Sequence, residues 1–203
     1  MTHSLHRSGS IESQRRDYVW LMYQAKGIND KNIKEKAMEF IAVAEAVGSE
    51  NWGDVKSGPK VVYSVEEIKS KISDQSRLRG VFTKNEQVVQ FLRMIQEKKM
   101  GISVIISGLL PETLAACKEA GLTPHTINFS LGVWGKKELL QSEEILAITT
   151  MCGHNMIQPG FVEEVMEEVK KGKITPEEGG LKLAVFCPCG IFNQVRAAKL
   201  LEA

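Results

Sequence analysis

The spacing of hydrophobic residues divides the chain into a helical beginning, a mixed middle and a helical end. From residue 11 to residue 48, apolar residues recur at helical spacing in two stretches, which predicts two helices separated near Gly27. The second stretch has a continuous apolar stripe from Ile33 to Val47 and ends at Gly48, a typical C-terminal cap. We therefore expect an N-terminal helical hairpin, followed by a Gly-, Ser- and Asn-rich linker at residues 49–59.

Between residues 60 and 130, short apolar runs alternate with amphipathic segments. The runs predict strands at Val61–Tyr63, Gly80–Phe82, Ile102–Ile106 and Thr126–Phe129. The segments between them predict helices at Val65–Ile72, Asn85–Met100 and Pro111–Ala120. Because apolar strands joined by helices are typical of parallel sheets, we expect an α/β fold with a small, mostly parallel sheet of three or four strands and flanking helices.

The pattern becomes helical again after Gly135. Helices are predicted to begin near Ser142, Phe161, Thr175 and Asn193, and the Thr175-Pro-Glu-Glu178 sequence is a strong start signal. The sequence thus predicts a helical hairpin at 1–58, a sheet layer at 59–135 and a helical segment at 136–203, all within one compact domain.

Composition and charge narrow the function classes. The chain has 203 residues with 26 Lys and Arg against 25 Asp and Glu, a formal charge of +1. This balance argues against nucleic-acid binding, because such proteins usually carry a basic excess. There is no apolar run long enough for a transmembrane helix, and the polar start lacks a signal-peptide stretch. We therefore expect a cytoplasmic protein that neither enters a membrane nor depends on disulfides.

Three of the four cysteines fall close to a histidine at breaks between predicted helices. The two short motifs are Cys152-Gly-His154 and Cys187-Pro-Cys189-Gly190, and Gly or Pro in each lets the chain turn. Three thiolates and one imidazole form a complete set of four ligands for zinc or for an iron–sulfur cluster. The sequence therefore predicts a metal site made of Cys152, His154, Cys187 and Cys189, whereas the helical spacing of Cys117 predicts a core position.

Other interpretations of these cysteines stay open. The Cys-x-Cys spacing is shorter than the usual Cys-x2-Cys of structural zinc sites, and buried, reduced cysteines are common in cores. A thiol-based redox role is a further alternative, with His154 as the base for a thiolate near a helix N-terminus.

A second candidate site follows from the predicted parallel sheet. Its strands would end at a common edge, where Ser107-Gly108, Ser130 and the glycine-flanked Trp134 could form a crevice for a small anionic ligand. No glycine-rich phosphate-binding motif accompanies them. His3 and His6 could add ligands and Arg7 could bind an anion, although segments near a terminus are usually mobile.

These observations lead to one leading hypothesis and two alternatives. The leading hypothesis is a cytoplasmic protein that binds zinc or an iron–sulfur cluster and has a redox or metal-dependent role. The alternatives are a non-enzymatic small-molecule-binding or regulatory module with a structural metal, and a thiol-based redox protein.

Overall fold

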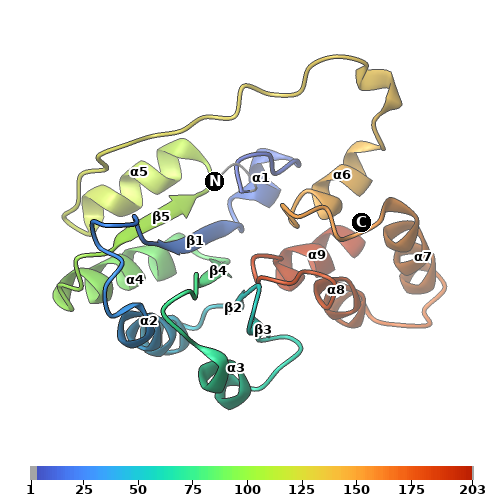
Figure 1. Ribbon diagram of the computed structural model, residues 1–203. Helices are drawn as coiled ribbons and strands as arrows, with labels where there is room; N and C mark the ends of the chain where they lie inside the picture. Colours follow the sequence, from blue (N-terminus) through green and yellow to red (C-terminus); the bar gives the residue numbers. More distant parts are fainter. Residues whose placement is uncertain (1–3, 203) are drawn as a thin grey trace.

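The computed structural model describes residues 4–202, and its centre is an antiparallel sheet with the strand order β3-β2-β4-β1-β5 (Figure 1). The strands of this part of the chain are β1 (Tyr18–Tyr23), β2 (Asn51–Asp54), β3 (Gly58–Pro59), β4 (Arg79–Phe82) and β5 (Ser103–Ser107). The sheet is open, and β3 and β5 form its two edges.

Helices occur before, between and after the strands. Those in the first part of the chain are α1 (Ile11–Gln14), α2 (Ile33–Val47), α3 (Val65–Lys71), α4 (Asn85–Glu97) and α5 (Leu110–Glu119). After the short 3-10 helix η1 (Lys137–Leu139) come α6 (Glu143–Thr149), α7 (Pro159–Lys170), α8 (Pro176–Ala184) and α9 (Gln194–Leu201). Ser64 and Thr175 form the capping boxes that start α3 and α8.

The expected N-terminal helical hairpin is wrong in its first half. Residues 18–23 form the inner strand β1 instead of a helix, and between residues 4 and 17 only the one-turn helix α1 precedes it. Trp20 and Leu21 are both almost completely buried, on opposite faces of the sheet. A strand that is buried on both faces has no polar–apolar alternation, and its apolar residues can match a helical spacing by chance.

The expected parallel sheet is also wrong. β1 pairs antiparallel with both β4 and β5, so these two strands run in the same direction without touching. A strand, a helix and a second strand in the same direction are typical of a parallel crossover, and β4, α4 and β5 follow this order. In the structure, however, β1 lies between β4 and β5 and pairs with both. The mixture of helices and strands still fits the α/β character that the sequence predicts.

Two further strand predictions fail at the edges of the sheet. The supposed linker forms β2 and β3, which pair with each other, and β2 also pairs with β4. Residues 61–63 follow β3 as a turn, and residues 126–129 form no strand. The long segment 121–142 instead passes over α5 and β5 as an exposed connection to α6 (Figure 1).

Each face of the sheet has its own hydrophobic core. On one face, Trp20 packs among aromatic rings beneath α2 and α4, with its ring centroid 5.1 Å from that of Phe91. On the other face, Val19, Leu21 and Val81 pack against α6 to α9. Cys152, Cys187 and Cys189 belong to this second core, so the sheet and the C-terminal helices together position them. No helix in residues 4–202 combines the length and the apolar character needed to cross a bilayer.

Candidate functional site

The side chains of Cys152, His154, Cys187 and Cys189 come together although they belong to two separate loops. Cys152 and His154 follow α6, while Cys187 and Cys189 lie between α8 and α9. The Cys187 sulfur is in hydrogen-bond contact with the sulfurs of both other cysteines. Nδ1 of His154 lies 3.5 Å from Sγ of Cys189. All four residues that the sequence predicts as ligands therefore form one cluster, called the thiol cluster below.

The thiol cluster is buried at its sulfur end and open at its histidine end. The three cysteines are at most 2% exposed, whereas His154 is an exposed residue. His154 is therefore the member of the thiol cluster that is in contact with solvent.

Backbone N–H groups point at each of the three sulfurs. His154 and Met156 donate to Cys152, Cys189 and Phe192 donate to Cys187, and Ile191 donates to Cys189. Hydrogen bonds from amides stabilise thiolates more than thiols, because the acceptor is then charged. The two loops are thus folded in a way that favours negative charge on sulfur.

The three cysteines do not share this negative charge equally, because Cys187 holds most of it. The thiols of Cys152 and Cys189 donate to Cys187 and hold the pKa of Cys187 well below its usual value. Donation to Cys187, together with burial, raises the pKa of both Cys152 and Cys189. This arrangement fits a single thiolate that accepts hydrogen bonds from two thiols. Partial desolvation of its ring, together with the nearby positive charge of Arg79, lowers the pKa of His154 and favours the neutral imidazole that metals require.

Arg79 is a component of the site that the sequence reasoning missed. It opens β4 and faces the thiol cluster, where its charge favours the thiolate of Cys189 and the neutral imidazole of His154. Its Nη1 atom is buried and has no hydrogen-bond partner within residues 4–202. A buried guanidinium nitrogen without a partner is costly unless negative charge lies close by. One signal in the sequence could have indicated this role. Arg79 lies two positions before the apolar Val81, so in a strand both side chains point to the same, inward-facing side.

Arg7 ties the two cysteine loops together. Its Nη2 donates to the carbonyl oxygen of Met151 at 3.0 Å and to that of Ile191 at 2.5 Å. Its Nη1 is paired with the buried carboxylate of Asp17, which also accepts from Arg196 at 2.6 Å. The expected role of Arg7 in binding an external anion is therefore replaced by an internal ion pair.

Asp17 is held in its charged form by this network. Burial by itself would raise the pKa of Asp17, but Arg7 and Arg196 act in the opposite direction, and the pKa is lowered overall. Asn193 adds a hydrogen bond to the same carboxylate, at 3.1 Å. Charge at Asp17 therefore helps to fix the beginning of the chain against both cysteine loops.

Gly190 lets the Cys187–Cys189 loop lie directly on β2. Its φ angle of 78° lies in the left-handed region, and a Cβ atom there would be 2.3 Å from the carbonyl carbon of Trp52. No other residue type fits this position without moving the backbone. The Pro-Cys-Gly sequence thus sets both the turn of the loop and its contact with the sheet.

As the structure stands, residues 4–202 contain no group of three or more His, Cys, Asp or Glu side chains arranged to hold a metal ion. Metal binding by the thiol cluster therefore calls for a side-chain adjustment, and His154 is the exposed member best placed to make it.

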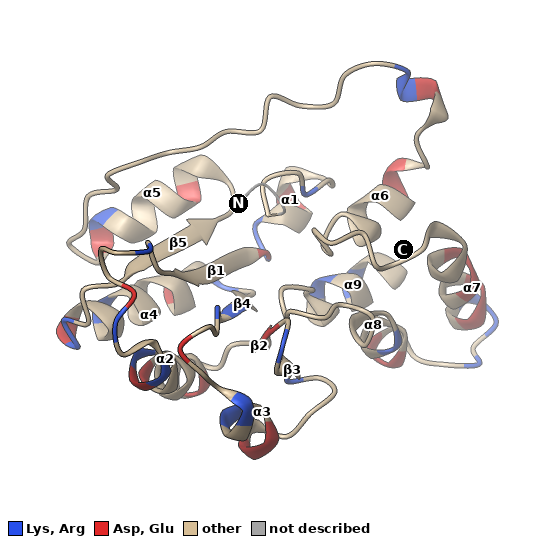
Figure 2. Ribbon diagram, in the orientation of Figure 1, with Lys and Arg blue, Asp and Glu red and all other residues tan. Residues whose placement is uncertain are grey.

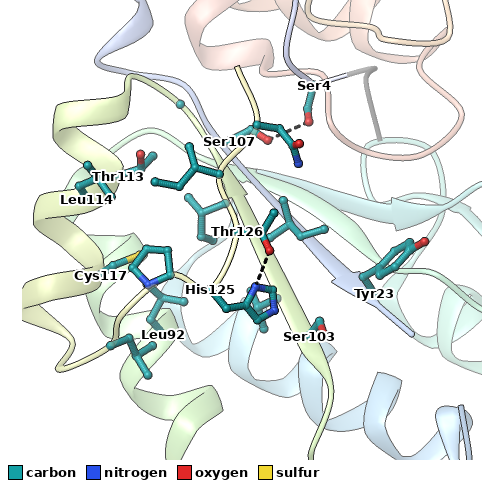
Figure 3. A pocket seen from close by; sticks show the side chains of 18 of the residues that line it. Ser4, Tyr23, Leu92, Ser103, Ser107, Thr113, Leu114, Cys117, His125 and Thr126 are labelled. Atoms are coloured by element: carbon teal, nitrogen blue, oxygen red, sulfur yellow. Dashed lines mark hydrogen bonds between the residues drawn. The ribbon is translucent and has the colours of Figure 1, made fainter. Parts of the chain in front are cut away.

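Three of the four residues predicted to form a ligand crevice lie around one cavity. Ser107, Gly108 and Ser130 line a cavity of about 1020 Å³ beside β5 (Figure 3). Trp134 is not among its lining residues, is 81% exposed and donates its indole N–H to the carbonyl oxygen of Leu131. The expected common edge of parallel strands does not exist, so α5 and the segment after it bring these residues together instead.

Of the predicted ligands near the N-terminus, His6 lies at Ser130 and not at the thiol cluster. Nδ1 of His6 lies 3.1 Å from the hydroxyl oxygen of Ser130, whereas His3 lies outside the described residues. Cys117, which the sequence predicts as a core residue, is half-buried and packs against the first core at the wall of the cavity.

Comparison of the chain with models of protein families, with curated proteins and with solved structures found no match. Any function assigned to the chain therefore depends on the chemistry of its own residues.

Proposed function

We propose that the protein binds one metal ion, with Zn²⁺ as the first candidate, through Cys152, Cys187, Cys189 and His154. The observation that carries this proposal is the contact of three buried sulfurs from two loops, with a histidine nitrogen 3.5 Å from one of them. Core packing alone does not require three cysteines and a histidine to meet at one point.

The spacing of the donor atoms favours a single ion over an iron–sulfur cluster. Metal–sulfur and metal–nitrogen bonds of about 2.3 and 2.0 Å at a tetrahedral angle separate the two donor atoms by about 3.5 Å. The distance of 3.5 Å between His154 and Cys189 agrees with that value. In a four-iron cluster, each cysteine binds a different iron atom, so its sulfurs are spread apart by the cluster.

The charges around the thiol cluster also suit a bound cation with thiolate ligands. One divalent ion with three thiolates and one neutral imidazole carries a net charge of −1. Arg79 supplies one positive charge beside the cluster, and the backbone N–H groups supply hydrogen bonds to the sulfurs. Such partners around the ligands are typical of metal sites, because they fix the ligands and tune the ion.

The exposed histidine favours a working site with an exchangeable position. Three buried thiolates would stay bound, while His154 could give way to a water molecule or a substrate atom. A zinc ion in such a site lowers the pKa of bound water and polarises carbonyl groups. This supports a metal-dependent role. A purely structural ion is the competing account, and it requires His154 to stay bound throughout.

A reducing compartment suits this site. Cys152, Cys187 and Cys189 are in contact and are not joined by disulfides. Adjacent thiols persist best in the cytoplasm, where disulfides are uncommon. A cytoplasmic location is therefore part of the proposal.

The proposal is tested by purifying the protein without oxygen and measuring its metals, acid-labile sulfide and visible spectrum. The expected result is one zinc ion per chain and no colour. A brown protein with iron and sulfide would support a cluster and overturn the single-ion proposal. A metal-free protein that also fails to bind added Zn²⁺ would overturn metal binding altogether.

Two serine substitutions make the metal measurement specific. Cys187→Ser removes the central sulfur of the thiol cluster and is expected to abolish stoichiometric zinc. Cys117→Ser removes a half-buried cysteine from a different part of the fold and is expected to leave the zinc content unchanged. Equal zinc content in the two variants would count against the site.

A thiol-based redox function is the second candidate, because the sulfurs of Cys152 and Cys187 are already in contact. Their two thiols would form a disulfide while an oxidant accepts two electrons and two protons. Mild oxidation of the metal-free protein, followed by peptide mapping, tests this candidate. A reversible Cys152–Cys187 disulfide in a protein that binds no metal would favour it over the metal site.

A further inference from the structure

The cavity beside β5 opens onto the edge of a strand. Every residue from Gly101 to Leu110 lines it, although successive strand residues point to opposite faces. Within residues 4–202, β5 pairs only with β1, so its outer edge faces the cavity. Residues 122–130 line the opposite side. The cavity is therefore a slot between two extended segments of chain, with main-chain polar groups along one wall.

The long wall of the slot is apolar. Leu92 of α4 and Leu114 and Cys117 of α5 lie beside the strand, as Figure 3 shows. Val104 and Ile106 of β5 are only half-buried, although both are apolar residues in a strand. A volume of about 1020 Å³ is the size of a small-molecule site, and such sites are mostly apolar with a few polar groups.

One end of the slot carries hydroxyl groups. The hydroxyl oxygens of Ser4 and Ser107 are 2.8 Å apart, and both residues are buried (Figure 3). Ser130 lines the same cavity and contacts His6. A ligand with a hydrogen-bonding group at one end would meet donors and acceptors here.

The charges around the slot argue against a charged ligand. Arg7 lines the cavity but is paired with Asp17, and Lys99 is exposed, so its charge stays in water. The segment 121–135 contains no Lys, Arg, Asp or Glu, and Figure 2 shows it without charged residues. The expected small anionic ligand therefore finds no unpaired, buried cation among the described lining residues.

From these observations we infer that the slot binds an elongated, uncharged and largely apolar small molecule. Its polar group would lie at Ser4 and Ser107, and its apolar body would lie along Leu92, Leu114 and Cys117. This site is separate from the thiol cluster, since none of the four proposed metal ligands lines it.

A neutral apolar dye tests whether the slot binds ligands. Nile red should become fluorescent on binding the protein. Cys117→Phe fills the wall of the slot and should weaken dye binding by at least about tenfold. Val62→Phe is the matched control at an exposed site after β3, and it should leave binding unchanged. Equal dye binding by both variants, or no dye binding at all, would overturn the inference.

A chemical protection experiment needs no variant. Cys117 is half-buried at the slot wall, whereas the other cysteines are buried. Octanol should slow the alkylation of Cys117 by N-ethylmaleimide in the unaltered protein, as mapped by mass spectrometry. Alkylation at an unchanged rate would count against a ligand in the slot, even if Cys117→Phe failed to fold.

Competition among three eight-carbon compounds tests the uncharged character of the ligand. Octanol should displace Nile red at a concentration at least about tenfold lower than octanoate or octylammonium. Ser107→Ala should weaken octanol binding and leave dye binding largely intact. A stronger effect of octanoate would show that the slot takes an anion and would contradict the inference.

Discussion

At the scale of single residues, the thiol cluster depends on a glycine that contributes no chemistry. Gly190 has a left-handed backbone and lies against β2, so the turn that presents Cys187 and Cys189 cannot form with a larger residue. Gly172 also has a positive φ angle, but it has open space where a Cβ would be. Alanine substitutions at these two positions therefore distinguish the free-energy cost of the left-handed backbone from the free-energy cost of the steric clash.

We expect Gly190→Ala to lower the free energy of unfolding by about 2–4 kcal/mol, because it adds a steric clash to left-handed strain. Gly172→Ala carries the strain alone and should cost about 1–2 kcal/mol. Urea denaturation measures both values. Equal losses would show that the approach of the loop to Trp52 is unimportant.

The Asp17 network predicts a dependence of stability on pH. The folded-state pKa of Asp17 lies below the unfolded value of about 3.9, so unfolding at low pH takes up a proton. The contribution of Asp17 is therefore complete above about pH 5 and is lost as the pH falls through the folded-state pKa. Asp17→Asn should cost about 3 kcal/mol at pH 7, because it leaves two buried arginines without their anion.

The same variant should lose less stability than the unaltered protein between pH 5 and pH 3. Urea denaturation at a series of pH values measures the difference. If the free energy of unfolding fell by the same amount in both proteins between pH 5 and pH 3, Asp17 would not be a main source of the acid sensitivity.

Residue types alone predicted the members of the thiol cluster but not its surroundings. Three cysteines and a histidine at Gly- and Pro-marked breaks were sufficient to predict that Cys152, His154, Cys187 and Cys189 meet. Arg7 and Arg79 were missed because their roles depend on the chain returning to the same place in space. Arg7 contacts residues 144 and 184 positions away, and no spacing in the sequence predicts such contacts.

At the scale of elements, the two cysteine loops are joined by Arg7 as well as by their own sulfurs. Arg7 donates to the carbonyls of Met151 and Ile191, which are close in sequence to Cys152 and Cys189. Residues that orient metal ligands in this indirect way typically change metal affinity by 10–100-fold. Arg7 is therefore a positioning residue in the proposed site.

Arg7→Gln should weaken Zn²⁺ binding by about 10–100-fold, because the two loops lose their shared hydrogen-bond donor. Competition with a chelating dye measures the affinity. Arg15→Gln, at an exposed ion pair with Glu112, is the matched control and should have no effect. Equal affinity in both variants would mean that the loops hold their positions without Arg7.

The sequence predicted most helices of the fold but not the order of its strands. The helices corresponding to α2–α9 have apolar stripes and caps, which are local signals. β1 is buried on both faces. Its Tyr, Val and Trp residues, which favour strands, indicated its structure better than the apparent helical spacing of its apolar residues. β2 contains Asn, Gly and Asp, so it is a strand mainly because it pairs with β4 and β3. Pairing of this kind is a tertiary effect that local propensity does not contain.

At the scale of the whole molecule, the sheet separates two hydrophobic cores of different composition. One core contains the aromatic cluster around Trp20, and the other contains the three cysteines among α6–α9. The last four helices are short, so their packing depends strongly on the loops that join them. A metal ion shared by two of those loops would stabilise this half of the molecule most.

Removal of the ion should therefore lower the melting temperature. An ion present at about a thousand times its Kd contributes about 4 kcal/mol, which corresponds to about 10 °C for a chain of this size. Calorimetry with and without a strong chelator measures the shift. Cys187→Ser should melt at the same temperature in both conditions. An unchanged melting temperature for the unaltered protein would show that no such ion is bound.

X-ray absorption spectroscopy of the bound metal tests the proposed site most directly. The expected result is a single ion with three sulfur neighbours at about 2.3 Å and one nitrogen neighbour at about 2.0 Å. A metal–metal distance would show a cluster, and a shell of oxygen and nitrogen atoms alone would show that the thiols do not bind. Either of these two results would contradict a single metal ion held by Cys152, Cys187, Cys189 and His154.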